Sequence, residues 1–157
     1  MADNSSDNEK IDFVIPWVDG SDPEWLKERN AVSSEGGCGS DSLKNGDSIE
    51  DNSGARYYSW DNLQFWFRGV EKFAPWVNKI HFVTWGHIPP WMNTDAPKLH
   101  IVNHKDYIPE QFLPTFNSNT IELNFHRIEG LSEKFVYFND DVFLLKPAAK
   151  EDFFRNG

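Results

Sequence analysis

The most constraining feature of the sequence is a short apolar run that stops abruptly in a cluster of turn residues. Residues 11–18 are apolar apart from Asp12, and Asp-Gly-Ser-Asp-Pro follows at once at 19–23. This order predicts a buried strand that ends in a polar loop. Asp22 can cap a helix that has Pro23 at its first position, so we expect a short helix as far as residue 30.

The rest of the sequence alternates between helix and strand patterns. Apolar residues recur every three or four positions over residues 61–73, which predicts an amphipathic helix. A further helix is predicted over 119–128, where Asn119 and Glu122 have capping-box spacing. Short β-branched or aromatic runs predict strands at 79–85, 99–103 and 134–139. This alternation predicts an α/β sandwich with a mostly parallel sheet.

Charge and composition divide the chain and exclude several classes of protein. The net charge is −10, of which residues 1–55 carry −9, and an acidic chain is a poor partner for nucleic acid. No run is long and apolar enough to span a membrane, and the start is unlike a signal peptide. We therefore expect a cytoplasmic protein, with a peripheral position at the membrane as an open alternative. The lone Cys38 excludes an internal disulfide.

Composition also gives the expected domain organisation. Residues 1–10 form a polar leader, and 11–30 form the first structured region. Residues 31–55 contain five Gly, six Ser and no aromatic side chain, which favours a flexible insertion that serves as a solvated spacer over one with a regulatory role. Residues 56–157 hold 21 of the 24 aromatic residues and form the second region of the same domain.

Two polar clusters follow predicted strands at their carboxyl ends, where ligands bind in open α/β sheets. Asp19 to Asp22 forms one cluster, and Asn139-Asp140-Asp141 forms the other. The second offers hard oxygen ligands that suit Mg²⁺ or Mn²⁺, although acids are also common in turns. In the same way, Asp19 and Asp22 suit either a substrate-binding loop or a tight turn with a helix cap.

The predicted helix at 119–128 carries a second set of polar candidates. Glu122 and His126 lie four residues apart and suit general acid/base chemistry, or else an exposed pair. The Arg127 side chain suits bidentate hydrogen bonding to a phosphate, or else an ordinary exposed position on the surface. Trp17, Trp85 and Trp91 lie near loop ends, where they either stack on a ring of the ligand or pack in the core.

Together these segments resemble a known family. IDFVIPWVDGSDP at 11–23, EKFAPWVNKIHFVTWGHIPPWMN at 71–93 and TFNSNTIELNFHRIEGLSEKFVYFNDDVF at 115–143 are similar to signatures of the Stealth family of sugar-phosphate transferases. The resemblance implies transfer of a hexose-1-phosphate from a nucleotide-diphosphate sugar to a hydroxyl of a sugar or polysaccharide acceptor, forming a phosphodiester. It also implies a fold similar to the nucleotide-sugar transferase (GT-A-like) α/β sandwich. No oligomeric state is implied.

The resemblance also implies roles for single residues. The implied catalytic positions are Glu122, Asp141, His126 and Arg127. The implied substrate-binding positions are Asp19, Gly20, Ser21, Asp22, Asn117 and Arg68. The implied ligands of Mg²⁺ or Mn²⁺ are Asn139, Asp140 and Asp141.

The family typically carries two further signature regions, so we expect this chain to form an incomplete version of the sandwich. Apolar residues near its end should then be exposed, namely Phe143, Leu144, Phe153 and Phe154. Two alternatives remain open. One is a metal-dependent glycosyltransferase that breaks the C1–O bond of the sugar, and the other is a truncated module that binds a nucleotide sugar without turnover.

Overall fold

The structure is a computed structural model that describes residues 10–34 and 61–155. Within these residues, four strands form one sheet in the order β3-β2-β1-β4, and every neighbouring pair is parallel. The strands are β1 (Ile11–Trp17), β2 (Ile80–Thr84), β3 (Leu99–Asn103) and β4 (Lys134–Tyr137). The α/β class and the parallel sheet predicted from the sequence are therefore confirmed.

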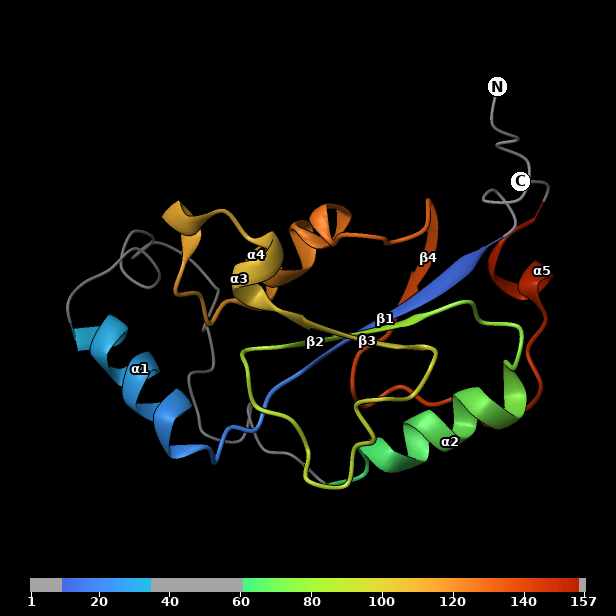
Figure 1. Ribbon diagram of the computed structural model, residues 1–157, viewed down its shortest axis with the longest axis horizontal. Coiled ribbons are helices and arrows are strands. Elements are labelled where there is room, and N and C mark those ends of the chain that lie inside the picture. Colours follow the sequence, from blue (N-terminus) through green and yellow to red (C-terminus); the bar gives the residue numbers. More distant parts are fainter. Residues whose placement is uncertain (1–9, 35–60, 156–157) are drawn as a thin grey trace, which may run out of the picture.

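Helices cover both faces of this sheet (Figure 1). The helix α2 (Leu63–Phe73) lies on one face, while α3 (His104–Tyr107) and α4 (Ser118–Leu123) lie on the other. The helix α1 (Pro23–Ser34) extends beyond the carboxyl end of β1, and α5 (Lys150–Phe153) lies near its amino end. Two short 3-10 turns complete the described elements, η2 (Glu110–Phe112) and η3 (Phe125–Arg127).

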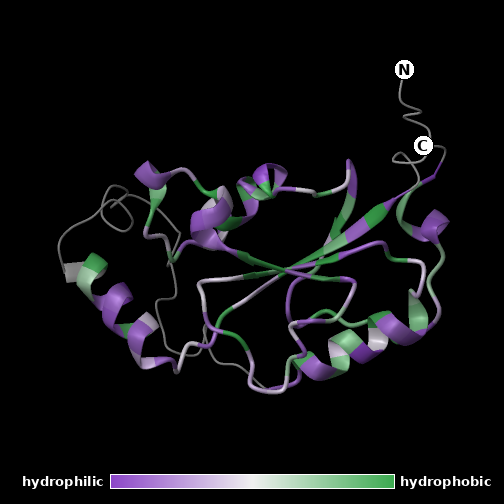
Figure 2. Ribbon diagram, in the orientation of Figure 1, coloured by the Kyte–Doolittle hydropathy of each residue, from purple (hydrophilic) through white to green (hydrophobic). Residues whose placement is uncertain are grey.

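The central strand β1 is buried on both faces because its side chains alternate between two cores. Phe13 and Ile15 join the core beneath α2, whereas Val14 joins the core beneath α3 and η3. All three side chains are fully buried. Figure 2 shows hydrophobic residues concentrated in the middle of the strands, while α1 is mostly hydrophilic.

One charged side chain, Asp12, is also fully buried in β1. Its carboxylate accepts hydrogen bonds from Asn78 Nδ2 at 2.7 Å, Lys79 N at 3.0 Å and Ser132 N at 2.8 Å. It also lies 3.1 Å from His81 Nε2. Burial raises the pKa of this carboxyl, but the hydrogen bonds outweigh burial and lower the pKa overall. Asp12 therefore joins three separate segments at the amino edge of the sheet.

The predicted helix over 119–128 is wrong in its bounds and in its continuity. The side chain of Asn117, not of Asn119, caps the helix by accepting from the backbone N–H groups of Asn119 and Thr120. The helix then ends at Leu123, because the side chain of Asn124 bonds to the Thr120 carbonyl at 2.8 Å and the chain turns into η3.

The helix after Pro23 has its predicted start, with Asp22 as the cap, but it runs to Ser34 rather than residue 30. The first residues assigned to the flexible insertion are thus helical. The remainder of that predicted insertion, from residue 35 onward, lies outside the described residues, as does most of the polar leader.

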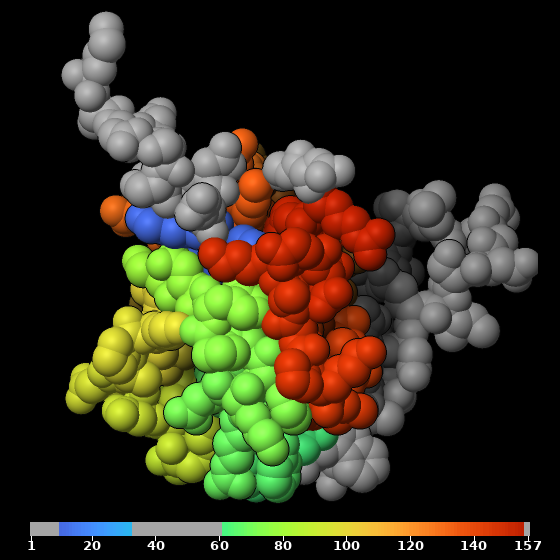
Figure 3. Space-filling view, turned by 90° about the vertical axis from the view of Figure 1, so that its right-hand side faces the viewer, coloured from blue at the N-terminus to red at the C-terminus, as the bar shows by residue number. Residues whose placement is uncertain are grey.

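The expected exposure is wrong for the four apolar residues that were named, although Val142 and Leu145 of the same segment are exposed. Phe143, Leu144, Phe153 and Phe154 are partly buried and pack against the core beneath α2. This segment lies alongside α2 in Figure 3, and Trp76 Nε1 donates a hydrogen bond to the Ala148 carbonyl at 2.6 Å. These contacts hold the segment in place against the rest of the domain.

Candidate functional site

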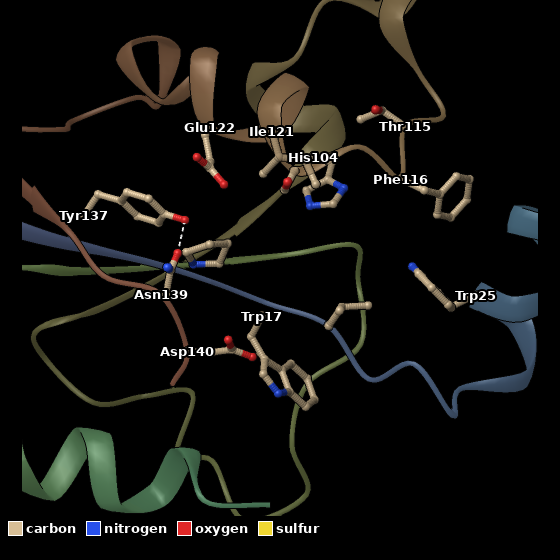
Figure 4. A pocket seen from close by; sticks show the side chains of 13 residues that line it. Trp17, Trp25, His104, Thr115, Phe116, Ile121, Glu122, Tyr137, Asn139 and Asp140 are labelled. Atoms are coloured by element: carbon tan, nitrogen blue, oxygen red, sulfur yellow. Dashed lines mark hydrogen bonds between the residues drawn. The ribbon is translucent and has the colours of Figure 1, made fainter. Parts of the chain in front are cut away.

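The strand order places a pocket at the edge where a site is expected. From β1 the chain passes to β2 and β3 on one side and returns to β4 on the other, so β1 and β4 flank a topological switch point. A pocket of about 350 Å³ opens at their carboxyl ends (Figure 4). Residues at the ends of both strands and directly after them line it, namely Pro16, Trp17, Val18, Tyr137, Asn139 and Asp140.

One wall of the pocket is acidic. Glu122 of α4 and Tyr137 of β4 point toward one another in Figure 4, and the phenol hydroxyl donates to the side-chain oxygen of Asn139 with the charge of the Glu122 carboxylate close by. Burial, the neighbouring Glu122 carboxylate and the other nearby acidic charges raise the pKa of Tyr137. The phenol therefore stays protonated at neutral pH and can act as a donor.

Asp140 lies on the same wall beside Tyr137 and Asn139. Partial burial of its carboxyl, together with the charge of Asp141, raises the pKa of Asp140. A carboxylate whose ionised form is disfavoured in this way gains from a nearby cation. Asp140 and Asn139 supply hard oxygen atoms of the kind that Mg²⁺ and Mn²⁺ prefer. Among the described residues, no three His, Cys, Asp or Glu side chains converge in a metal-binding group.

The opposite wall is aromatic. Trp25 of α1 is buried and makes an edge contact with Phe116, with ring centroids 5.5 Å apart. Both rings line the pocket, together with Trp17 and Ile121. Aromatic rings of this kind offer flat apolar surface for a base or a sugar ring. The pocket thus combines an apolar end with an acidic end.

His104 forms part of the pocket floor at the end of β3. Burial lowers the pKa of His104 to about 4, and the charge of His87 acts in the same direction. At neutral pH this imidazole is therefore uncharged. Its Nδ1 atom is buried and has no hydrogen-bond partner among the described residues.

The loop after β1 has the structural role that its sequence suggests. Asp19 Oδ1 accepts hydrogen bonds from Ser21 N at 2.9 Å and Ser21 Oγ at 2.6 Å, which closes a tight turn. Asp22 Oδ1 accepts from Glu24 N and Trp25 N, each at 2.9 Å, and caps α1. The loop residues 19–22 do not line the pocket themselves, but they connect two residues that do, Val18 and Trp25.

The structure brings together only some of the predicted site residues. Glu122, Asn139 and Asp140 line the pocket. The remaining predicted residues outside the 19–22 loop are exposed and lie outside the lining, namely Arg68, Asn117, His126, Arg127 and Asp141.

Glu122 and His126 are separated because the helix breaks between them. After Asn124 the backbone follows a 3-10 turn, so the two side chains no longer share the face that α-helical spacing gives them. The Nδ1 atom of His126 instead lies 2.9 Å from the carbonyl oxygen of Leu123. The structure therefore does not support a Glu122–His126 acid/base pair.

Sequence reasoning missed two pocket residues that a simple rule would have found. Tyr137 precedes Asn139 by two positions at the end of β4, where side chains two apart share a face. His104 follows β3 directly, so it also lies at the carboxyl edge of the sheet. Both obey the rule that singled out Asp19 and Asp140. No comparable sequence pattern marks Trp25 and Phe116 as pocket residues. Their positions depend on where α1 and the segment before α4 lie relative to the sheet.

A parallel α/β sheet with a pocket at a switch point defines a Rossmann-like or partial GT-A-like domain. Comparison with known families agrees with this class. Residues 56–157 match the model described as Stealth protein CR2, conserved region 2, and residues 9–37 match Stealth protein CR1, conserved region 1. The chain belongs to the Stealth family.

Several curated relatives carry informative names. The chain is 49% identical over 146 residues to the capsular polysaccharide phosphotransferase WcwK of Streptococcus pneumoniae, covering 93% of this chain and 41% of the relative. It is 45% identical over 146 residues to CpsJ of Streptococcus thermophilus, also named a capsular polysaccharide phosphotransferase, covering 93% and 58%. It is 46% identical over 145 residues to the receptor polysaccharide phosphotransferase WefC of Streptococcus oralis, covering 92% and 41%. The chain thus spans between two fifths and three fifths of these relatives.

Within the described part of the chain, no helix has the length and apolar character needed to cross a membrane.

Proposed function

We propose that this chain contributes the donor-binding part of an enzyme that transfers a hexose-1-phosphate from a nucleotide-diphosphate sugar to a sugar hydroxyl. The product would be a phosphodiester in a capsular or cell-surface polysaccharide, formed in the cytoplasm by a protein that is free or peripheral at the membrane. The relatives' names, which describe polysaccharide phosphotransferases, support this reaction class. The observation that carries the proposal is the pocket itself, with an apolar aromatic end and an acidic end within one cavity.

The two ends of the pocket suit the two parts of such a donor. Trp17 and Phe116, which are partly exposed, provide ring surfaces for the nucleoside or the sugar, and the buried Trp25 backs Phe116. Glu122 and Asp140 lie at the other end, where the diphosphate would be placed. Because two carboxylates repel phosphate, this arrangement needs a cation between protein and donor. When bound, Mg²⁺ or Mn²⁺ would supply that charge and stabilise charge on the phosphoryl oxygens.

The residues fit such an ion in chemistry and in number. Asp140, with Asn139 beside it and Asp141 next in sequence, provides one or two carboxylates and an amide oxygen. Mg²⁺ is often bound through one or two carboxylates plus water and substrate phosphate. The raised pKa of Asp140 favours the same assignment, because a cation would offset both the partial burial of the carboxylate and the repulsion from Asp141.

In the proposed reaction, the acceptor hydroxyl oxygen attacks the phosphorus bonded to the sugar. The bond between that phosphorus and the bridging oxygen breaks, and a nucleoside monophosphate leaves. The sugar C1–O bond stays intact, and Glu122 takes the proton of the acceptor hydroxyl. Tyr137 holds the Glu122 carboxylate toward the pocket.

Product analysis tests this proposal against its alternatives. A polypeptide that contains this chain is incubated with nucleotide-diphosphate sugars, Mg²⁺ and a polysaccharide acceptor, and the nucleotide product is identified. A nucleoside monophosphate together with a new phosphodiester supports phosphotransfer. A nucleoside diphosphate would indicate a glycosyltransferase. Metal-dependent donor binding without turnover would indicate a binding module.

A further inference from the structure

A histidine outside the pocket lining connects the segment after β2 to the loop after β1. The backbone at His87 is fixed by Thr84 Oγ1, which donates to the His87 carbonyl at 2.7 Å and accepts from Gly86 N at 3.3 Å. Gly86 has φ +147°, a conformation that other residues rarely adopt. These interactions place the His87 ring in one position at the carboxyl edge of the sheet.

The ring is enclosed and makes a specific hydrogen bond. Only 10% of the side chain is exposed, and it packs edge-on against Trp17, with centroids 5.2 Å apart. His87 Nε2 accepts a hydrogen bond from the backbone N–H of Asp19 at 2.8 Å. An imidazole nitrogen that accepts an N–H carries no proton, so the neutral ring must be protonated at Nδ1.

The Nδ1 atom faces the other end of the same loop. It lies 3.9 Å from Asp22 Oδ2, is buried, and has no hydrogen-bond partner among the described residues. Burial lowers the pKa of His87, opposed by the charges of Asp22 and Asp19. The uncharged ring therefore accepts a hydrogen bond from the Asp19 amide through Nε2, and its Nδ1 atom faces the Asp22 carboxylate.

The two loop residues touched by His87 determine where two pocket walls lie. Asp19 follows Trp17 and Val18, and Asp22 caps the helix that presents Trp25. We propose that His87 is a positioning residue, which holds the Asp19–Asp22 loop through the Nδ1–H tautomer and so fixes the spacing between Trp17 and Trp25. The inference uses the proposed function only in treating this pocket as the binding site.

Two substitutions that differ by one methylene test the proposal. In His87→Gln, the side-chain oxygen reaches about as far as Nε2 and can accept from Asp19 N, while the amide group can donate toward Asp22. In His87→Asn, the shorter side chain ends near the position of Nδ1. We expect hydrogen exchange at the Asp19 amide to accelerate at least tenfold in His87→Asn and to stay within about threefold of the parent in His87→Gln. The Trp25 indole resonance should shift only in His87→Asn.

Equal acceleration in both variants, or none in either, would contradict the proposal, because a general packing role does not distinguish the two side chains. A measurement on the unsubstituted protein keeps the test independent of how the variants fold. A long-range ¹H–¹⁵N spectrum at pH 7 should show His87 as the Nδ1–H tautomer, and an Nε2–H tautomer would overturn the assignment. Neither readout depends on transferase activity, so failure here is distinguishable from failure of the proposed function.

Discussion

The hydroxyl group of Tyr137 on β4 lies between two partners, the carboxylate of Glu122 on α4 and the side-chain oxygen of Asn139. This contact joins the helix to the end of the strand across the switch point of the sheet. Since the pKa of Tyr137 is raised, the phenol remains a donor throughout the physiological range. We therefore expect the orientation of Glu122 in the pocket to depend on Tyr137.

Removing the Tyr137 hydroxyl should reduce the turnover rate more than it reduces the stability of the fold. For Tyr137→Phe we expect kcat to fall about tenfold or more, with a loss of about 1 kcal/mol in the free energy of unfolding. The decisive measurement is a double-mutant cycle with Glu122→Gln. The two effects on kcat should be clearly less than additive, because both changes break one contact. Full additivity would show that Tyr137 acts independently of Glu122.

When no metal is present, the ionised carboxylate of Asp140 should reduce the stability of the folded protein. Its raised pKa means that the folded state disfavours the ionised form, so at pH 7 the charge destabilises the fold. We therefore expect Asp140→Asn to raise the Tm in metal-free buffer. Excess Mg²⁺ should raise the Tm of the parent but not of the variant.

Asp95→Asn is the matched control, because Asp95 is an exposed aspartate outside the pocket. This variant should respond to Mg²⁺ as the parent does. An equal Mg²⁺ response in Asp140→Asn would remove Asp140 from the proposed metal site.

His104 should make stability depend on pH. Its folded pKa of about 4 lies below the ordinary value of 6.5, so the unfolded state binds more protons between these values and stability falls as the pH drops through that window. The contribution of one such proton is about 1.4 kcal/mol per pH unit. In His104→Leu, urea unfolding from pH 7 to pH 4 should show a shallower loss of stability. An unchanged slope would show that His104 is charged or accessible in the folded state.

Asp12 should be essential for folding rather than for chemistry. In Asp12→Asn, one carboxylate oxygen becomes an N–H donor that faces groups which themselves donate. We expect a loss of about 3 kcal/mol in the free energy of unfolding, measured by urea denaturation. A loss below about 1 kcal/mol would mean that the network tolerates an amide. The exposed Asp95→Asn again serves as control and should change stability by less than about 0.5 kcal/mol.

Much of the fold was predictable because it depends on local patterns. Apart from Asp12, the run Ile11–Trp17 is apolar on both faces and ends at turn residues, so it identifies a central strand of a parallel sheet. Asp22 and Pro23 marked the start of α1 for equally local reasons. The break at Asn124 was not predictable in this way, since the apolar spacing over 119–128 continues past Asn124 and does not reveal that its side chain bonds to the Thr120 carbonyl.

The sequence predicted where the candidate site lies, but it did not predict all of the residues that line it. Strand ends located Asn139 and Asp140 because the carboxyl edge of a parallel sheet is set by topology. The places of His126 and Arg127 depend on how the chain turns after α4, which spacing alone does not determine. Asp12 shows the reverse case, since its four partners come from two distant segments, 78–81 and the one at Ser132, and no local pattern predicts them.

The central claim is that this pocket supports transfer of a sugar phosphate, with Glu122 as the group that receives the proton of the acceptor hydroxyl. ³¹P NMR of the reaction products tests it most directly, with Glu122→Gln compared against Glu133→Gln, an exposed glutamate outside the pocket. The account predicts a new phosphodiester signal and an equal amount of nucleoside monophosphate for the parent and for Glu133→Gln, and neither product for Glu122→Gln. Release of nucleoside diphosphate by the parent, or undiminished phosphodiester formation by Glu122→Gln, would contradict it.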